Sequence, residues 1–253
     1  MRVTVLGSGT SGGVPLLGCK CEVCQSEDSK DKRLRPSIML EWEGKRVVVD
    51  CGPDFREQMM RAEADYLDAI VFTHSHRDHT AGLDDIRSYN FLSKVDMPIY
   101  LNEQTFKILK RQFEYIFEPN PYPGVPKVDV QIINHSAFEL FGKKWQPISV
   151  LHYKMEVYGF RIGDFVYITD ANYISEEEKA KIKGCKVLIL NALRKEKHLS
   201  HFTLSEALHL VEELEPEQTY LTHVSHQMGK HEEVSKELPS NVAFAYDGLS
   251  FTV

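Results

Sequence analysis

The chain has 253 residues and a mass of 29.1 kDa, enough to bury a substantial core without disulfides. Hydrophobic residues make up 42% and charged residues 26%, which excludes a mainly disordered chain. There are 30 Lys and Arg against 37 Asp and Glu, and the net charge of -7 argues against broad electrostatic binding of nucleic acid. No apolar run approaches the ~20 residues of a membrane span and no secretory signal is visible, so we expect a cytoplasmic protein without a membrane partner.

Short apolar strands dominate the first half of the predicted structure. Runs rich in β-branched residues and bounded by Gly, Pro or charged residues predict strands. Helices are predicted where apolar residues recur at helical spacing, or where a capping residue precedes them. The predicted strands are 3–6, 37–42, 46–50 and 69–72, and the predicted helices are 55–62 and 103–117.

The second half continues this pattern, with Thr203 and Glu206 forming a capping box at the start of its last helix. No linker, repeat or composition shift divides the chain, so we expect one domain over residues 1–253. Many strands and few helices, without strict alternation, predict sheet layers flanked by helices, an α/β (α+β) fold. The predicted strands are 145–151, 155–162, 165–168, 187–190, 218–221 and 242–246, and the predicted helices are 175–182 and 203–214.

The stretch THSHRDHTAGLDD, directly after the predicted strand 69–72, carries the strongest functional signal. It places His74, His76, Asp78 and His79 within six residues. Imidazole nitrogens and carboxylate oxygens are typical ligands of zinc and similar divalent ions. Because a loop that leaves a strand can direct several side chains into one space, the pattern indicates a metal site that can serve two adjacent ions. The alternative, a surface loop that is rich in histidine by chance, is disfavoured by the spacing.

The H-x-H-x-D-H pattern in HSHRDH resembles the signature of the metallo-β-lactamase fold superfamily. The resemblance implies a four-layered αββα sandwich with a metal pair at the lip between the two sheets. It requires further ligands at strand ends downstream, and His152, Asp170 and His223 each follow a predicted strand. In the family pattern one metal ion is held by His74, His76 and His152, the other by Asp78, His79 and His223, and Asp170 bridges them.

A second cluster lies in GSGTSGGVPLLGCKCEVC, where Cys19, Cys21 and Cys24 form a C-x-C-x-x-C pattern. Three thiolates need a fourth ligand to close a tetrahedral zinc site. The cluster and its glycine-rich lead-in resemble the PhnP-like phosphoribosyl cyclic phosphodiesterases, in which the fourth ligand is a His three residues after the last catalytic ligand. Here that residue is His226, so the resemblance implies one structural Zn²⁺. Buried cysteines without a metal are the alternative interpretation.

The same resemblance implies a metal-dependent hydrolase, a phosphoric diester hydrolase, that acts on a small phosphorylated substrate. The expected reaction is hydrolysis of 5-phosphoribosyl 1,2-cyclic phosphate or a similar cyclic phosphate, with a hydroxide activated by two Mn²⁺ or Zn²⁺ ions. His201, 22 residues before His223, matches the general-acid position, and His198 is its competitor. We expect Asp78 to be a catalytic residue as well as a metal ligand. The resemblance also implies a homodimer.

Three other functions stay open from the sequence. One is a thioester or lactam hydrolase, because the same metal pair activates water for either. An RNase Z-like tRNA 3′-end endonuclease shares the H-x-H-x-D-H set, but the cysteine cluster, the lack of an evident basic arm and the net charge of -7 argue against it. A PqqB-like non-catalytic accessory protein resembles the chain at the cysteine cluster. A decayed site would lack ligands, whereas all seven expected positions are filled. Arg56 and Arg87 are either phosphate contacts or solvated surface residues.

Overall fold

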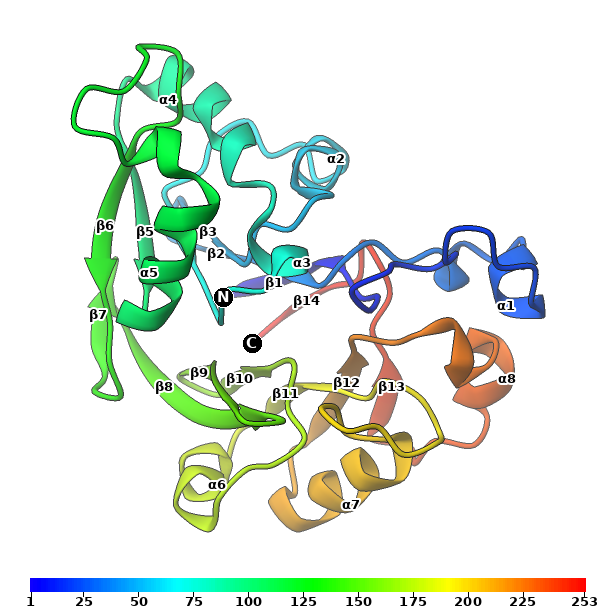
Figure 1. The fold of residues 1–253 in the computed structure, drawn as a ribbon. Coiled ribbons are helices and arrows are strands. Elements are labelled where there is room, and N and C mark those ends of the chain that lie inside the picture. Colours follow the sequence, from blue (N-terminus) through cyan, green and yellow to red (C-terminus); the bar gives the residue numbers. More distant parts are fainter.

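The computed structural model describes residues 1–253 and contains two seven-stranded sheets (Figure 1). In spatial order, the first sheet consists of β14 (Ser250–Thr252), β1 (Arg2–Gly7), β2 (Ser37–Trp42), β3 (Lys45–Val49), β4 (Ala69–Val71), β5 (Met97–Leu101) and β6 (Val128–Ile132). The second consists of β13 (Val242–Phe244), β12 (Gln218–Thr222), β11 (Val187–Asn191), β10 (Phe165–Ile168), β9 (Met155–Ile162), β8 (Lys143–His152) and β7 (Phe138–Leu140).

Helices cover the outer face of each sheet (Figure 1). The first sheet carries α2 (Phe55–Arg61), α4 (Arg87–Ser93) and α5 (Glu103–Gln112). The second carries α6 (Glu176–Ile182), α7 (Leu204–Leu214) and α8 (His231–Ser235). The connections hold the short helices α1 (Glu22–Gln25) and α3 (Arg77–Thr80) and the 3-10 turns η1 (Ser29–Asp31), η2 (Leu83–Ile86), η3 (Glu114–Ile116) and η4 (His226–Met228).

Side chains that alternate along the strands produce three apolar cores and therefore four layers. On β3, Val47 and Val49 belong to the core between the two sheets, together with Tyr167 of β10. Val48, between them, belongs to the core beneath the helices of the first sheet, with Phe55 of α2. A third core fills the space between the second sheet and its helices. The predicted αββα architecture is confirmed.

Both sheets are mixed, and their parallel parts supply the strand ends that the expected site needs. The pairs from β3 to β6 are parallel, as are the pairs from β10 to β13. β8 and β9 form an antiparallel hairpin. Since parallel strands end at the same edge of a sheet, loops that follow β3, β4, β10 and β12 can converge.

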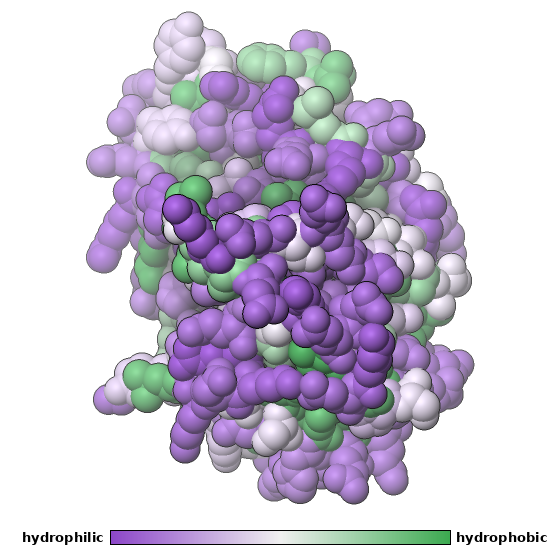
Figure 2. All heavy atoms as spheres, turned by 90° about the vertical axis from the view of Figure 1, so that its right-hand side faces the viewer, coloured by the Kyte–Doolittle hydropathy of each residue, from purple (hydrophilic) through white to green (hydrophobic).

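The predicted helix 103–117 is shorter in the structure. α5 ends at Gln112 because Phe113 leaves the helical conformation, with φ of -125° and ψ of 45°, and a 3-10 turn follows. None of the helices has the length and apolar character needed to cross a membrane. The face of the molecule on which α1 and α8 lie is mainly hydrophilic, with small scattered apolar patches (Figure 2).

Candidate active site

The expected catalytic ligands come together from strand ends of both sheets. The segment that follows β4 leads through His74 and His76 into α3, which contains Asp78 and His79. The second sheet contributes the last residue of β8, His152, together with Asp170 after β10 and His223 after β12.

The Asp170 carboxylate lies at the centre of this cluster and is 1% exposed. Its Oδ1 is 3.4 Å from His79 Nε2 and 3.0 Å from His223 Nδ1. Its Oδ2 is 3.8 Å from His74 Nε2 and 4.0 Å from His152 Nε2. The two oxygens therefore face two different sets of side chains, which is the arrangement that a carboxylate shared by two ions requires.

The donor atoms fit divalent ions in kind and in spacing. Buried polar atoms usually have a hydrogen-bond partner, yet the Nε2 atoms of His74 and His79 have none, as expected of atoms that coordinate a metal ion. Three groups have ligand atoms within 4.8 Å of one another: Asp78, His79, Asp170 and His223; His74, His76 and Asp170; and His152, Asp170 and His201.

The electrostatics of the cluster favour a cation. Burial lowers the pKa of His74 well below its ordinary value, which leaves the ring in the neutral form that binds metals. Burial also acts to lower the pKa of His79, but the neighbouring carboxylates of Asp78, Asp170 and Asp50 outweigh it and hold that pKa well above the ordinary value. Several carboxylates thus converge on one buried imidazole, and a divalent ion would neutralise them.

Asp50, which the sequence analysis did not assign, positions His79. It follows β3, is completely buried, and accepts hydrogen bonds from His79 Nδ1 at 2.7 Å and from the Thr73 amide and hydroxyl at 2.8 Å each. A bond at Nδ1 directs Nε2 of His79 towards the cluster. The available signal was an Asp that closes an apolar run, VVVD, in the same way that Asp170 closes VYITD.

Other contacts hold the ligand loops of the second sheet. His152 Nδ1 donates to the Ser200 carbonyl at 2.8 Å, which leaves its Nε2 facing the cluster. The Asn191 side chain accepts from the Ala171 amide at 2.8 Å and donates to the Ala171 carbonyl at 2.9 Å. This pair of hydrogen bonds between neighbouring strand ends fixes the backbone beside Asp170.

His201 lies beside the cluster, with its ring centroid 4.6 Å from that of His152 and 4.7 Å from that of His223. Burial, reinforced by the charge of His223, lowers the pKa of His201 to about 2, so the ring is neutral in this state. Its competitor His198 has Nδ1 facing the amide and hydroxyl of Ser200, each at 3.3 Å. The geometry thus places His201, rather than His198, in a group with His152 and Asp170.

The cysteine cluster brings residues far apart in the chain together. His226 Nδ1 is 3.5 Å from Cys19 Sγ and 3.3 Å from Cys21 Sγ, and the four donor atoms, Cys24 Sγ included, lie within 4.8 Å of one another. Hydrogen bonding to His226 lowers the pKa of Cys21 to about 6, whereas burial raises the pKa of Cys24 to about 11. Three thiols and one imidazole are a donor set that fits tetrahedral zinc.

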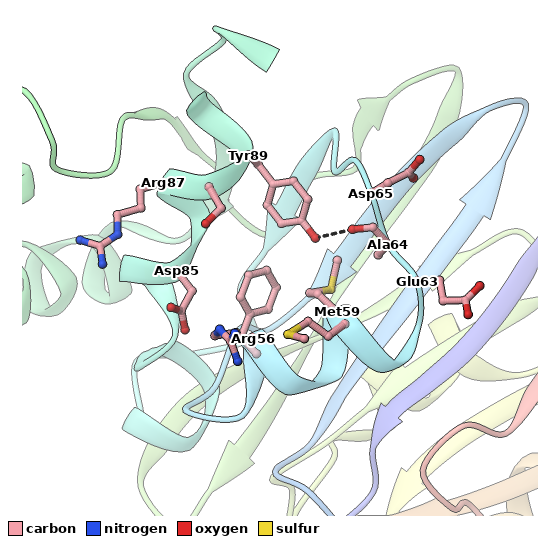
Figure 3. A pocket seen from close by; sticks show the side chains of 11 residues that line it. Arg56, Met59, Glu63, Ala64, Asp65, Asp85, Arg87 and Tyr89 are labelled. Atoms are coloured by element: carbon pink, nitrogen blue, oxygen red, sulfur yellow. Dashed lines mark hydrogen bonds between the residues drawn. The ribbon is translucent and has the colours of Figure 1, made fainter. Parts of the chain in front are cut away.

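Arg56 and Arg87 do not converge on the candidate site. They line a separate cavity of about 680 Å³ between α2 and α4, and none of the expected metal ligands is in its wall (Figure 3). Arg87 pairs with Asp84 at 3.4 Å, and its guanidinium points away from the Tyr89 ring (Figure 3). Neither arginine therefore supplies a phosphate contact at the cluster in this structure.

Sequence comparisons connect the chain to known proteins. The family described as "Beta-lactamase superfamily domain" matches residues 45–224. A relative named octanoyltransferase, from Porphyromonas gingivalis, is 36% identical over 252 residues, which are 98% of this chain and 51% of the relative. The chain thus spans about half the length of this relative.

Solved structures extend this result. The structure of "a New Diphosphatase from the PhnP Family" matches with a TM-score of 0.94 and 42% identity, and the match covers 100% of this chain and 97% of that one. Zn²⁺-bound PqqB from Methylobacterium extorquens matches with a TM-score of 0.81 and 19% identity over 100% of both chains, which shows a shared fold. The chain therefore belongs to the β-lactamase superfamily and, within it, to the PhnP family.

Proposed function

We propose that this protein is a metal-dependent phosphodiesterase that hydrolyses a small cyclic phosphate, 5-phosphoribosyl 1,2-cyclic phosphate or a close analogue. The observation that carries the proposal is the Asp170 carboxylate, whose two oxygens face separate sets of donors. The ligands that we assign to one Mn²⁺ or Zn²⁺ ion are His74, His76 and His152, those of the other are Asp78, His79 and His223, and Asp170 is shared. Such ions supply a water of lowered pKa and neutralise charge on a phosphoryl group.

The protein itself orients the ligands and supplies a proton. Asp50 and the Ser200 carbonyl hold the rings of His79 and His152 in fixed orientations. We assign proton donation to the departing alkoxide to His201. A phosphate ester brings negative charge next to that ring and acts to raise its pKa, which favours the protonated form that a general acid needs. General-acid catalysis of this kind contributes ~10²–10⁴ in rate.

We assign the cysteine cluster to one structural Zn²⁺. Four protein ligands, Cys19, Cys21, Cys24 and His226, close a tetrahedral site and leave no position for a substrate. The cluster would join the N-terminal loop to η4, directly after the loop that carries His223. Its expected role is to hold these two loops together.

A second candidate reaction is cleavage of a phosphoanhydride. It is favoured by the PhnP-family relative described as a diphosphatase, at 42% identity. The same donor set can bind a diphosphate, so the leaving group would then be a phosphate instead of an alkoxide. The relative named octanoyltransferase is about twice as long as this chain.

Phosphorus NMR tests the proposal. Purified protein loaded with Mn²⁺ would be incubated with 5-phosphoribosyl 1,2-cyclic phosphate and, separately, with a dinucleoside diphosphate. Asp170→Asn is the control, because it keeps the shape of the side chain and removes the charge. Loss of the cyclic phosphodiester signal with the wild type alone supports the proposed reaction, and the position of the product phosphate identifies the ester bond that breaks.

Other results would redirect the assignment. Cleavage of the dinucleoside diphosphate alone would replace the cyclic phosphodiesterase by a diphosphatase. A precursor tRNA with a 3′ extension, included as a third substrate, tests the endonuclease alternative. If metal-loaded protein cleaves none of the three, the accessory-protein alternative gains support and the phosphodiesterase proposal is withdrawn.

A further inference from the structure

A cavity opens beside the candidate active site, next to its most exposed ligand. Among the seven proposed ligands of the catalytic ions, His76 alone is exposed, Asp78 is half-buried and the others are buried. A cavity of about 460 Å³ is lined by His76 and His152 and continues away from the cluster. Its volume is within the range of small-molecule sites. A substrate that is bound at the exposed ligand can extend into this space.

Two wall residues of this cavity, Tyr153 and Lys154, form the two-residue turn between β8 and β9. Tyr153 has a φ of +58°, a conformation that is strained for a bulky residue and that turns of this kind usually give to Gly, Asn or Asp. Its amide donates at 2.6 Å to Oδ1 of Asn172, a residue that lies two positions after Asp170. Tyr153 is 48% exposed, so burial in the protein does not account for an aromatic residue at this position.

The cavity also carries an unpaired positive charge. Lys154 is exposed and has no carboxylate partner, and its Nζ lies 5.2 Å from the centroid of the Tyr153 ring. In a chain of net charge -7, a free ammonium group beside two metal-ligand candidates offers a local binding point for an anion. Leu199 lines the same cavity from the loop that contains His201 and is 67% exposed.

We propose that this cavity binds the non-reacting part of the substrate, with Lys154 binding a second phosphate group and Tyr153 and Leu199 packing against the sugar ring. The inference rests on the proposed function, because it takes the reacting phosphate to be held at the Asp170 cluster. It adds the residues that distinguish a substrate with two phosphate groups from a substrate with one. The strain at Tyr153 then has a purpose, since the turn presents both a ring and a cation to the substrate.

The test compares two substrates that differ in one group. Wild type and Lys154→Gln would be assayed on 5-phosphoribosyl 1,2-cyclic phosphate and on ribosyl 1,2-cyclic phosphate, which lacks the second phosphate. A charge-assisted contact that is equal in the ground state and the transition state affects KM and not kcat. We expect Lys154→Gln to raise KM about tenfold for the first substrate, with little change in kcat and no change for the second.

Matched variants separate this effect from general damage. Lys144→Gln removes an exposed lysine at the other end of β8 and should leave both substrates unaffected. Tyr153→Ala and Leu199→Ser should raise KM for both substrates alike, because each substrate retains the sugar ring. Equal effects of Lys154→Gln on the two substrates, or none on either, would overturn the proposal.

A binding measurement keeps this inference separate from the proposed reaction. Calorimetric titration of the Mn²⁺-loaded protein with ribose 1,5-bisphosphate and with ribose 1-phosphate requires no turnover. Weaker binding of the bisphosphate alone to Lys154→Gln supports the second-phosphate site even if the wild type hydrolyses neither cyclic phosphate, a result that would remove the proposed reaction. Unchanged affinity of the bisphosphate in Lys154→Gln would reject the site.

Discussion

Three buried residues of the candidate site, Asp50, Asp170 and His223, have backbone φ values of 65°, 54° and 57°. Residues other than glycine seldom adopt this region, and each instance costs ~1–3 kcal/mol. Asp50 and His223 directly follow a strand and Asp170 follows one after a single residue, where a left-handed residue breaks the alternation and redirects the side chain. The position of the cluster at the sheet edge thus depends on local strain that the surrounding packing must offset.

Asp50→Asn tests whether the Asp50 carboxylate positions the proposed metal ligand His79. An amide cannot accept every hydrogen bond that Asp50 accepts from His79 and Thr73, so either a bond from Thr73 is lost or the proton of His79 moves from Nδ1 to Nε2. We expect affinity for the catalytic ions to fall ~10–100-fold, as measured by metal content after dialysis against graded chelator. Unchanged metal content and activity would show that Asp50 serves packing only.

His201→Ala tests the proton donor. We expect kcat to fall ~10²–10⁴-fold for an alkyl phosphodiester and much less for a nitrophenyl phosphodiester, because nitrophenolate departs without a proton. His198→Ala is the matched control, since His198 is the other histidine of this loop. Steady-state rates on the two leaving groups decide the matter, and equal losses on both would remove the acid role from His201.

At the scale of the element, the β8–β9 turn is where stability and binding conflict. Tyr153→Gly removes the strain of a positive φ and should leave the free energy of unfolding unchanged or up to ~1 kcal/mol higher. Lys154→Gly in the same turn, where φ is not positive, should lower it by ~0.5–1 kcal/mol. Urea denaturation of both variants makes this comparison. A loss in Tyr153→Gly as large as that in Lys154→Gly would show that the Tyr153 conformation is not strained.

The strands that the sequence predicts are those with continuous apolar runs. β2, β9 and β10 have the predicted bounds because their β-branched and aromatic residues are buried between layers. β5 and β6 were not predicted, since MPIYL contains a proline and VDVQI is an edge strand with polar residues at alternate positions. Their pairing depends on long-range partners, and propensity alone does not reveal it.

The candidate site was predictable to the extent that its residues form local motifs. H-x-H-x-D-H and C-x-C-x-x-C each lie in one short segment, and the family pattern extended them to His152, Asp170, His223 and His226. Asp50 and Asn191 act through contacts with residues 20 or more positions away. The binding role that we propose for Tyr153 can be inferred only when the backbone conformation of its turn and the neighbouring cavity are known. Such features depend on the tertiary structure and leave no spacing in the sequence.

At the scale of the whole molecule, the cysteine cluster joins segments 205 residues apart. Cys21→Ser should remove one zinc ion per chain and lower the melting temperature, because loss of the metal frees the N-terminal loop from η4. Cys185→Ala, which removes a buried thiol from the apolar core, should cost stability while zinc content stays the same. Atomic emission and thermal unfolding give both quantities. Equal zinc content in Cys21→Ser and wild type would contradict the assignment.

A polar network ties the two ends of the chain together around Arg33, which is 4% exposed. Its Nη1 donates to Ser8 Oγ at 2.9 Å and to the Ala245 carbonyl at 2.5 Å, and its Nη2 lies 3.1 Å from His231 Nδ1 in α8. Because Arg33 has only donors, His231 has to be neutral to accept. The single domain that we predicted stays a prediction, which a single cooperative unfolding transition would test.

The network predicts a pH dependence of stability. Burial and, next, the charge of Arg33 lower the pKa of His231 from 6.5 to about 4. Between these two pH values the unfolded chain binds a proton that the folded chain does not, so the contribution is complete above pH 6.5 and is lost as the pH falls towards 4. His231→Gln cannot titrate, and its amide oxygen can still accept from Arg33.

The variant should therefore lose less stability than the wild type on acidification through this window. Carboxylates with shifted pKa values, such as Asp170, titrate in both proteins and cancel in the difference between them. Urea denaturation at several pH values from 7 to 4 measures that difference. If the two stability curves ran parallel, the Arg33–His231 contact would not depend on a neutral imidazole, and the coupling between the chain ends would have to come from Ser8 and Ala245 alone.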